Sequence, residues 1–406
     1  MSGAFLKERC LGRIFAGHPW IYESDIQRFD KPPADGGEII ARTVTGGFVG
    51  AGFYNSKSKI PIRLYSRTKG EKLDETFFRQ RLLAAKELRA ASVSHVGPPL
   101  AGVPGSSPGA DRSSFRLVWS EGDFLPGLII DRYDDAWVIQ TLTLAMDQRK
   151  DMIVSLLKQL FDAKAVMERN DVPSRGYEGL PLQKGWLCGS GDPKRVVTLG
   201  HGRFEVDLLE GQKTGEYLDQ VANQMAVGAL AKGRKTLDGF TYHGGFALHA
   251  ALNGAASVEA VDISDGAIAI CRRNAELNGQ AKVTWKAANV FDDLNARVKA
   301  REAFDLIVLD PPSFTKSRAK LEEALRGYKE INLRAFQLLP SGGLLATFGC
   351  SHHVDAETFR AVVLDAAFDA HKIVRLRGVF GQPPDHPVIP AIPETEYLKG
   401  LLFEVV

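Results

Sequence analysis

The second half of the chain alternates short apolar segments with amphipathic ones, and this alternation constrains the fold more than any other feature of the sequence. The apolar segments read as strands, and the amphipathic segments read as helices because their apolar residues recur every three or four positions. Strands are expected at 234–240, 257–262, 283–288, 304–312 and 342–350, and helices at 247–252, 267–278 and 321–339. The alternation predicts an α/β domain with a mostly parallel sheet that is covered by helices on both faces.

The first part of the chain has a different pattern. Between residues 39 and 66, three short β-type runs are separated by glycine pairs or a polar turn, which is typical of a small β-barrel. A helix is expected to begin after Asp74, so a domain boundary is placed near residue 72. The region 73–190 combines strands with a helix and predicts a small α+β domain. Within it, the stretch 96–114 is rich in Pro, Gly and Ser and is expected to be a flexible surface insertion.

Basic residues are concentrated near the N-terminus. The 406-residue chain holds 51 Lys or Arg and 49 Asp or Glu. Residues 1–70, however, hold eleven of the former and six of the latter, which gives a local net charge of +5. Such a local excess suits a polyanionic partner such as nucleic acid.

The cysteines and the N-terminal segment exclude several classes of protein. The four cysteines lie far apart in the sequence, so we expect neither a disulfide framework nor a metal site. The chain has no signal peptide pattern and no uninterrupted run of about 18 apolar residues. We therefore expect a cytoplasmic protein with no membrane segment.

Polar residues follow the predicted strands of the second half. Asp238, Asp262 and Asp310 each come at the end of a strand, and Gly244 lies in the glycine-rich turn after the first of them. Ligands of such sheets bind outside the carboxyl ends of the strands, where glycines let the backbone approach closely. The dinucleotide fingerprint G-x-G-x-x-G is absent, so a dehydrogenase is disfavoured.

Several motifs then identify a family. LDGFTYHGGF, EAVDIS, RRNAELN and LDPPSF, in this order, resemble the class I S-adenosylmethionine-dependent methyltransferases. GQKTGEYLDQ, GHPWIYESDI, EGDFLPGLIIDRY and DHPVIPAIPETEYLKG narrow the resemblance to the large-subunit ribosomal RNA methyltransferase I family, the cytosine-carbon-5 type. The resemblance implies an RNA-binding PUA domain at 1–72, an α+β linking domain at 73–190 and a Rossmann-like methyltransferase domain at 191–406. It also implies S-adenosylmethionine as cofactor and 23S-type ribosomal RNA as substrate.

The implied reaction needs a nucleophile, because carbon 5 of cytosine attacks a methyl group only after a thiolate has added to carbon 6. The resemblance gives this role to Cys350, although a cysteine at a strand end is often simply buried. It gives Asp310 the role of hydrogen-bonding ring nitrogen 3 of the cytosine. The base that removes the carbon-5 proton is left open between His352 and water.

The remaining candidates concern the cofactor and the RNA. For the cofactor, we expect Asp262 at the ribose and Asn289 beside the adenine, where many relatives carry Asp. Asp238 and Gly244 are expected near the methionine portion, and Tyr242 and Asp310 are further cofactor-binding candidates. The candidates for RNA binding are Arg13, His18, Trp20, Lys57 and Lys213. His386 and Tyr397 are expected either to shape the pocket of the target base or to be packing residues.

Two other functions remain open from the sequence. A guanine N-methyltransferase has the same fold and needs no cysteine, and a ribosome assembly factor keeps the fold and binds RNA without catalysis. The sequence also leaves open a homodimer.

Overall fold

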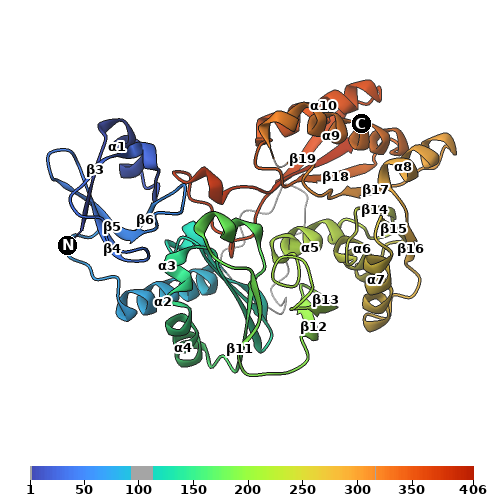
Figure 1. Ribbon diagram of the computed structural model, residues 1–406. Helices are drawn as coiled ribbons and strands as arrows, with labels where there is room; N and C mark the ends of the chain where they lie inside the picture. Colours follow the sequence, from blue (N-terminus) through green and yellow to red (C-terminus); the bar gives the residue numbers. More distant parts are fainter. Residues whose placement is uncertain (1, 93–112, 316) are drawn as a thin grey trace.

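The computed structural model describes residues 2–92, 113–315 and 317–406, which form three regions around a common centre (Figure 1). The N-terminal region is a curled sheet of six strands in the order β2-β6-β5-β4-β1-β3, with one helix packed on it. Its elements are β1 (Gly3–Leu6), α1 (Glu8–Phe15), β2 (Trp20–Ile21), β3 (Ile26–Phe29), β4 (Glu38–Arg42), β5 (Phe48–Tyr54) and β6 (Ile62–Ser66). The three strands expected between 39 and 66 are β4, β5 and β6, whereas β1, α1, β2 and β3 were not predicted.

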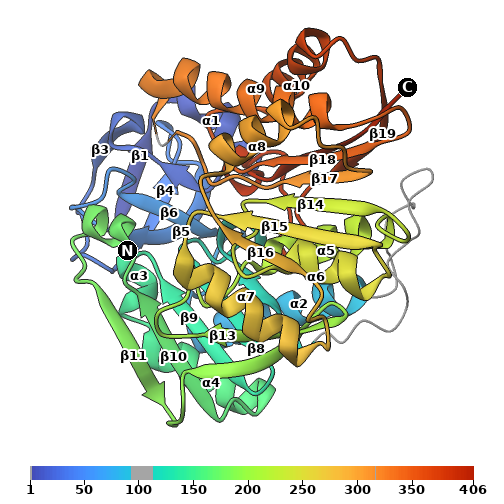
Figure 2. The ribbon, with the colours of Figure 1, turned by 90° about the vertical axis from the view of Figure 1, so that its right-hand side faces the viewer.

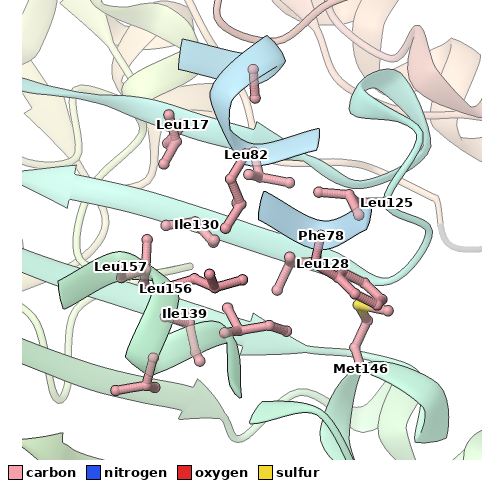
Figure 3. Packing of buried hydrophobic residues seen from close by; sticks show 14 of the residues in the cluster. Phe78, Leu82, Leu117, Leu125, Leu128, Ile130, Ile139, Met146, Leu156 and Leu157 are labelled. Atoms are coloured by element: carbon pink, nitrogen blue, oxygen red, sulfur yellow. The ribbon is translucent and has the colours of Figure 1, made fainter. Parts of the chain in front are cut away.

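The middle region is a five-stranded sheet, in the order β11-β10-β9-β8-β7, with helices packed on it. Its elements are α2 (Glu75–Ser92), β7 (Ser114–Trp119), β8 (Leu128–Tyr133), β9 (Ala136–Thr141), α3 (Leu144–Asp147), α4 (Lys150–Phe161), β10 (Ala165–Asn170) and β11 (Gln183–Cys188). Phe78 and Leu82 of α2 and Leu156 and Leu157 of α4 converge on Ile130 of the sheet in one buried cluster (Figure 3). The expected insertion at 96–114 lies largely outside the described residues, and Ser114 already belongs to β7.

A hairpin of β12 (Lys194–Leu199) and β13 (Gly202–Asp207) links the middle region to the C-terminal one. Neither strand was predicted. Phe204 of β13 is buried with Leu248 and Ala275, which belong to helices of the C-terminal region. The hairpin thus continues the hydrophobic core from one region to the next.

The C-terminal region is a seven-stranded sheet in the order β16-β15-β14-β17-β18-β20-β19. Its strands are β14 (Lys235–Gly239), β15 (Ser257–Asp262), β16 (Thr284–Ala287), β17 (Leu306–Leu309), β18 (Leu344–Gly349), β19 (Val374–Phe380) and β20 (Lys399–Val405). Strands β14 to β18 run parallel, and β20 is antiparallel to both β18 and β19. The predicted mostly parallel α/β sheet is therefore confirmed, with two further strands that the sequence did not reveal, of which only β20 runs against the direction of the others.

Helices cover both faces of this sheet, as expected. Figures 1 and 2 show α8, α9 and α10 on one face and α5, α6 and α7 on the other. The helices are α5 (Val221–Ala229), α6 (Gly245–Leu252), α7 (Asp265–Leu277), α8 (Val290–Lys299), α9 (Leu321–Leu338) and α10 (Ala356–Asp369). Strands buried on both faces read as continuous apolar runs, which is why β17 and β18 were visible in the sequence. In the described part of the chain, no helix is long and apolar enough to cross a membrane.

Polar side chains hold the three regions together. Arg63 of β6 forms an ion pair with Glu178 of the middle region, at 2.8 Å. The Nε1 group of Trp20 donates to Glu121, at 2.7 Å. His18 contacts Glu394 of the C-terminal segment, with 3.1 Å between Nε2 and Oε2.

Candidate active site

Four of the candidate side chains come from four adjacent strands of the C-terminal sheet. Asp238 lies in β14, Asp262 ends β15, Asp310 follows β17 and Cys350 follows β18. All four strands are parallel, and Leu309 pairs with Thr347 just before Asp310 and Cys350. The carboxyl ends therefore meet at one edge, beside the point between β14 and β17 where the strand order reverses. Open α/β sheets bind their ligands at this position.

Asp238 is almost completely buried beneath the first turn. Its Oδ2 atom accepts hydrogen bonds from Thr241 Oγ1, at 2.5 Å, and from the Ala247 backbone N–H, at 3.0 Å. Its Oδ1 atom has no partner among the described residues. Burial, and secondarily Asp262, raises the pKa of Asp238 to about 7. A buried acceptor without a partner fits a hydrogen-bond donor on a ligand.

The turn after β14 brings the backbone close to this edge. Gly244 has a φ of +87°, and a Cβ at this position would lie 2.8 Å from the ring of Trp285. The Tyr242 backbone N–H donates to Asp262 Oδ2 at 2.9 Å, and the Tyr242 ring stacks on His243 with 3.6 Å between centroids. Asp262 is half-buried and also accepts from the Ser264 N–H. The turn thus orients the Asp262 carboxylate while leaving part of it accessible.

Asn289 lies farther along the same edge. It is the exposed N-cap of α8, where its Oδ1 atom accepts from the Phe291 N–H at 2.9 Å. An amide oxygen has two lone pairs, so one remains for a ligand.

Asp310 is part of a network of hydrogen bonds that the sequence did not predict. Its Oδ2 atom accepts from Gln220 Nε2 at 2.9 Å, and Gln220 in turn accepts from Asn223 at 2.7 Å. Burial, and secondarily Asp219, raises the pKa of Asp310 to about 7. At neutral pH, a large fraction of Asp310 is therefore protonated and can donate a hydrogen bond.

Asp219, next to Gln220, is buried and ionised. Lys213 Nζ donates to its Oδ2 atom at 2.5 Å, and the hydroxyl of Tyr397 donates to the same oxygen. Burial opposes this ionisation, but Lys213 and His386 outweigh it and hold the pKa of Asp219 far below its usual range. Lys213 also lies 4.6 Å from the ring centroid of Tyr217. The motif GQKTGEYLDQ therefore contributes a charged cluster to the active-site edge.

Cys350 is half-buried at the end of β18. Burial, and secondarily Asp310, raises the pKa of its thiol to about 11, while Lys213 and Lys399 act in the opposite direction. His352 is exposed on one side and lies 5.8 Å from the Tyr397 ring. Partial burial and Lys399 lower the pKa of His352, so its ring is neutral near pH 7 and able to accept a proton.

The other two residues of the expected base pocket are buried. The Tyr397 ring packs on Trp119, with 5.5 Å between centroids, and the His386 ring packs on the same indole at 5.4 Å. His386 Nδ1 lies 2.9 Å from Asp385 Oδ1. Tyr397 reaches the active-site edge through its hydrogen bond to Asp219, and His386 is near enough to Asp219 to lower the pKa of that carboxyl.

Four of the five RNA-binding candidates take part in internal contacts, namely Lys213 through its ion pair with Asp219 and three residues of the N-terminal region. His18 is only 3% exposed, and Trp20 is held by Glu121. Arg13 is half-buried and forms an ion pair with Asp25 at 2.8 Å. Lys57 is exposed. The structure therefore brings the cofactor candidates and the two catalytic candidates together at one edge, and leaves Arg13, His18, Trp20 and Lys57 in or beside the N-terminal sheet.

Comparison with known proteins agrees with this geometry. A family model described as S-adenosylmethionine-dependent methyltransferase matches residues 181–404, and a PUA-like domain model matches residues 5–67. A solved SAM-dependent methyltransferase from Streptococcus mutans has the same fold over the full length of both chains, with a TM-score of 0.79 at 20% identity. A methyltransferase structure in complex with S-adenosylhomocysteine gives a TM-score of 0.82, also at 20% identity. Fold and site thus define an S-adenosylmethionine-dependent methyltransferase with a PUA-like domain.

Curated relatives identify the family within this class. The chain is 38% identical to the ribosomal RNA large subunit methyltransferase I of Shewanella amazonensis, over 96% of this chain and 95% of that protein. It is 38% identical to the protein of the same name from Aeromonas hydrophila, over 95% and 94%. The chain belongs to the ribosomal RNA large subunit methyltransferase I family, and S-adenosylmethionine is its cofactor.

Proposed function

We propose that this protein transfers a methyl group from S-adenosylmethionine to carbon 5 of a cytosine in large-subunit, 23S-type ribosomal RNA through a covalent adduct with Cys350. The observation that supports this most strongly is the position of Cys350 and Asp310 at the ends of adjacent parallel strands, beside the cofactor candidates. A thiol in this position is needed for carbon-5 chemistry and has no role in guanine N-methylation.

The residues at the edge fit the cofactor. When bound, S-adenosylmethionine supplies an electrophilic methyl group. We assign the unpartnered Oδ1 atom of Asp238 to an amino group of the cofactor, because a buried carboxylate requires a donor. Asp262 is assigned to the ribose hydroxyls, Asn289 to the adenine, and the Tyr242–Gly244 turn to the methionine portion.

The chain's own residues then handle the cytosine. The Cys350 thiolate adds to carbon 6, and Asp310 in its protonated form donates to ring nitrogen 3, which accepts the negative charge that develops in the ring. After methylation, His352 removes the proton from carbon 5. The electron pair of that C–H bond restores the carbon 5–carbon 6 double bond, and the Cys350 thiolate leaves.

The substrate must expose its target base. Carbon 5 is shielded in a stacked helix, so the target cytosine has to be unpaired or flipped out. Lys57 and Lys213 are proposed to contact the RNA. The proposed domains are an N-terminal domain at 1–72, a linking domain at 73–190 and a catalytic domain at 191–406. We place the protein in the cytosol, where ribosomal RNA is made. A homodimer stays a prediction that sedimentation of the full chain would test.

Replacing the nucleophile tests the proposal. The Cys350→Ala variant should lose methyl transfer to undermodified 23S ribosomal RNA by about a thousandfold or more. The control is Cys188→Ala, since Cys188 is a half-buried cysteine in β11 of the middle region. Transfer of labelled methyl groups is measured, and calorimetry checks that each variant still binds the cofactor. Undiminished transfer by Cys350→Ala would favour guanine N-methylation, and failure of the wild type to bind the cofactor would favour the assembly factor.

A further inference from the structure

A cavity of about 210 Å³ lies where the three regions of the molecule meet, away from the catalytic edge. Its apolar walls are Leu64 and Tyr65 from β6, Pro126 from the middle region and Ile392 from the C-terminal segment. Tyr65 is fixed in place because its hydroxyl donates to the Pro126 carbonyl at 2.6 Å. None of the residues lining this cavity belongs to the candidate active site.

Two arginines line the cavity without neutralising partners. Among the residues that the structure describes, neither Arg67 nor Arg81 forms an ion pair. Arg67 donates through Nη2 to the His18 carbonyl at 3.0 Å, which leaves its charge uncompensated. Arg81 lies over two rings, 5.0 Å from the centroid of Phe77 and 5.6 Å from that of Phe124. Unpaired guanidinium groups at a cavity attract phosphate.

An exposed aromatic ring also lines the cavity. The Phe124 side chain is 48% exposed, although large apolar side chains are usually buried. Its φ of +57° is a left-handed conformation that disfavours residues other than glycine, and such conformations persist at ligand-binding positions. An exposed ring next to arginines is the arrangement on which unpaired bases stack.

One acidic residue, Glu121, shares the cavity, and both of its hydrogen-bond donors are uncharged groups. Its Oε1 atom accepts from Trp20 Nε1 at 2.7 Å, and its Oε2 atom accepts from the Ser120 hydroxyl. With two guanidinium groups and one carboxylate, the side chains that line the cavity carry a net positive charge. The carboxylate can still accept a hydrogen bond from the amino group of a base.

We propose that this cavity binds one unpaired nucleotide of the RNA substrate, outside the target cytosine, with its base on Phe124 and its phosphate on Arg67 and Arg81. This inference rests on the proposed function. The volume is below the range of about 300–1,000 Å³ typical of pockets for larger ligands, which suits a single base. The cavity is also connected to the active site through the chain. Ile392 lines the cavity, and the same segment continues to Tyr397, whose hydroxyl donates a hydrogen bond to Asp219.

The test uses the full chain and 23S ribosomal RNA transcribed in vitro. The double variant Arg67→Gln/Arg81→Gln removes two charges, and Phe124→Leu removes the ring but keeps apolar contact. The matched control is Lys282→Gln/Arg301→Gln, which also removes two exposed charges. These two residues precede β16 and β17, so they lie at the amino ends of the strands, opposite the catalytic edge. The dissociation constant for RNA is measured at several salt concentrations, and calorimetry measures cofactor affinity.

Each cavity variant should bind RNA about fivefold or more weaker, since base stacking and phosphate contacts have effects of this size. In the double variant, the slope of log affinity against log salt should be shallower by about 1 or more. Cofactor affinity should not change. Wild-type RNA affinity in both cavity variants, with normal methyl transfer by the wild type, would overturn the cavity proposal alone. A wild type that neither binds nor methylates the RNA would overturn the proposed function and this inference with it.

Discussion

At the residue scale, Asp310 and Cys350 must hold their protons in an uncommon order. Asp310, with a pKa of about 7, has to be protonated, while Cys350, with a pKa of about 11, has to be ionised. The reactive form, with protonated Asp310 and the Cys350 thiolate, holds one proton between the two groups. The form with ionised Asp310 and a neutral thiol also holds one proton, so the ratio of these two forms does not depend on pH. The fraction of the reactive form therefore increases with pH up to about 7 and then stays constant until the thiol titrates.

The pH dependence of methyl transfer should follow this scheme. We expect kcat/KM to rise about tenfold per pH unit below pH 7 and to level off above it. In the Asp310→Asn variant the amide does not titrate, so the reduced kcat/KM should keep rising between pH 7 and 9 as the Cys350 thiolate forms. Steady-state rates at fixed ionic strength provide the measurement. A wild-type profile that is flat from pH 5.5 to 8 would contradict the assigned roles.

The sequence predicted only part of the active site at this scale. Asp238, Asp262, Asp310 and Cys350 could be placed because each ends an apolar run. Asp219 lies within the motif GQKTGEYLDQ, but its hydrogen bond from the Tyr397 hydroxyl joins residues that are 178 positions apart in the chain. No local rule on residue type or spacing predicts that hydrogen bond, and the same is true of the bond from Gln220 to Asp310.

At the scale of the element, the turn between β14 and α6 depends on a glycine. Gly244→Ala combines an unfavourable positive φ with a Cβ 2.8 Å from Trp285. We expect the free energy of unfolding to fall by about 2–4 kcal/mol, and cofactor affinity to fall with it. Gly254→Ala is the matched control, because it has a φ of +81° but its Cβ would meet nothing within 4 Å, so only about 1 kcal/mol is expected. Urea unfolding of both variants measures the difference, and equal losses would show that the close approach to Trp285 is unimportant.

The pattern of predicted and missed elements has a physical reason. Central strands such as β17 are buried on both faces and are therefore continuous in apolar residues. The edge strand β19 alternates apolar residues with Arg375 and Arg377, and its partner β20 follows it in the chain but lies between it and β18. A local pattern does not reveal such an antiparallel insertion. Some boundaries were predicted accurately, such as those of β15 at 257–262 and the start of α2 after Asp74, whereas α8 and α10 were not predicted although Asn289 and Asp355 cap them.

At the scale of the whole molecule, the contact between His18 and Glu394 joins residues 376 positions apart. We expect Glu394→Ala to weaken the attachment of the N-terminal region by about 1 kcal/mol, because the carboxylate is partly exposed. Hydrogen exchange in residues 17–26 should become faster and KM for RNA should rise, while cofactor affinity stays the same. Glu323→Ala, an exposed change on α9, is the control. Unchanged exchange in the Glu394 variant would show that other contacts alone hold the region.

The relation between the regions was the least predictable part of the structure. The sequence indicated three regions, but it assigned His18 and Trp20 to an RNA surface, whereas both make contacts between regions. A buried contact and an exposed binding site use the same residue types, so composition does not separate them. The RNA role of these two residues stays a prediction.

The proposed mechanism depends most on a covalent bond between Cys350 and the target cytosine, and trapping that bond tests the mechanism most directly. With 23S ribosomal RNA that contains 5-fluorocytidine and with S-adenosylmethionine present, the fluorine on carbon 5 cannot leave as a proton does, so the adduct should persist. Mass spectrometry of the digested complex should find the nucleotide on the peptide that contains Cys350. Methylated RNA without any adduct, or an adduct on another residue, would contradict the proposed mechanism.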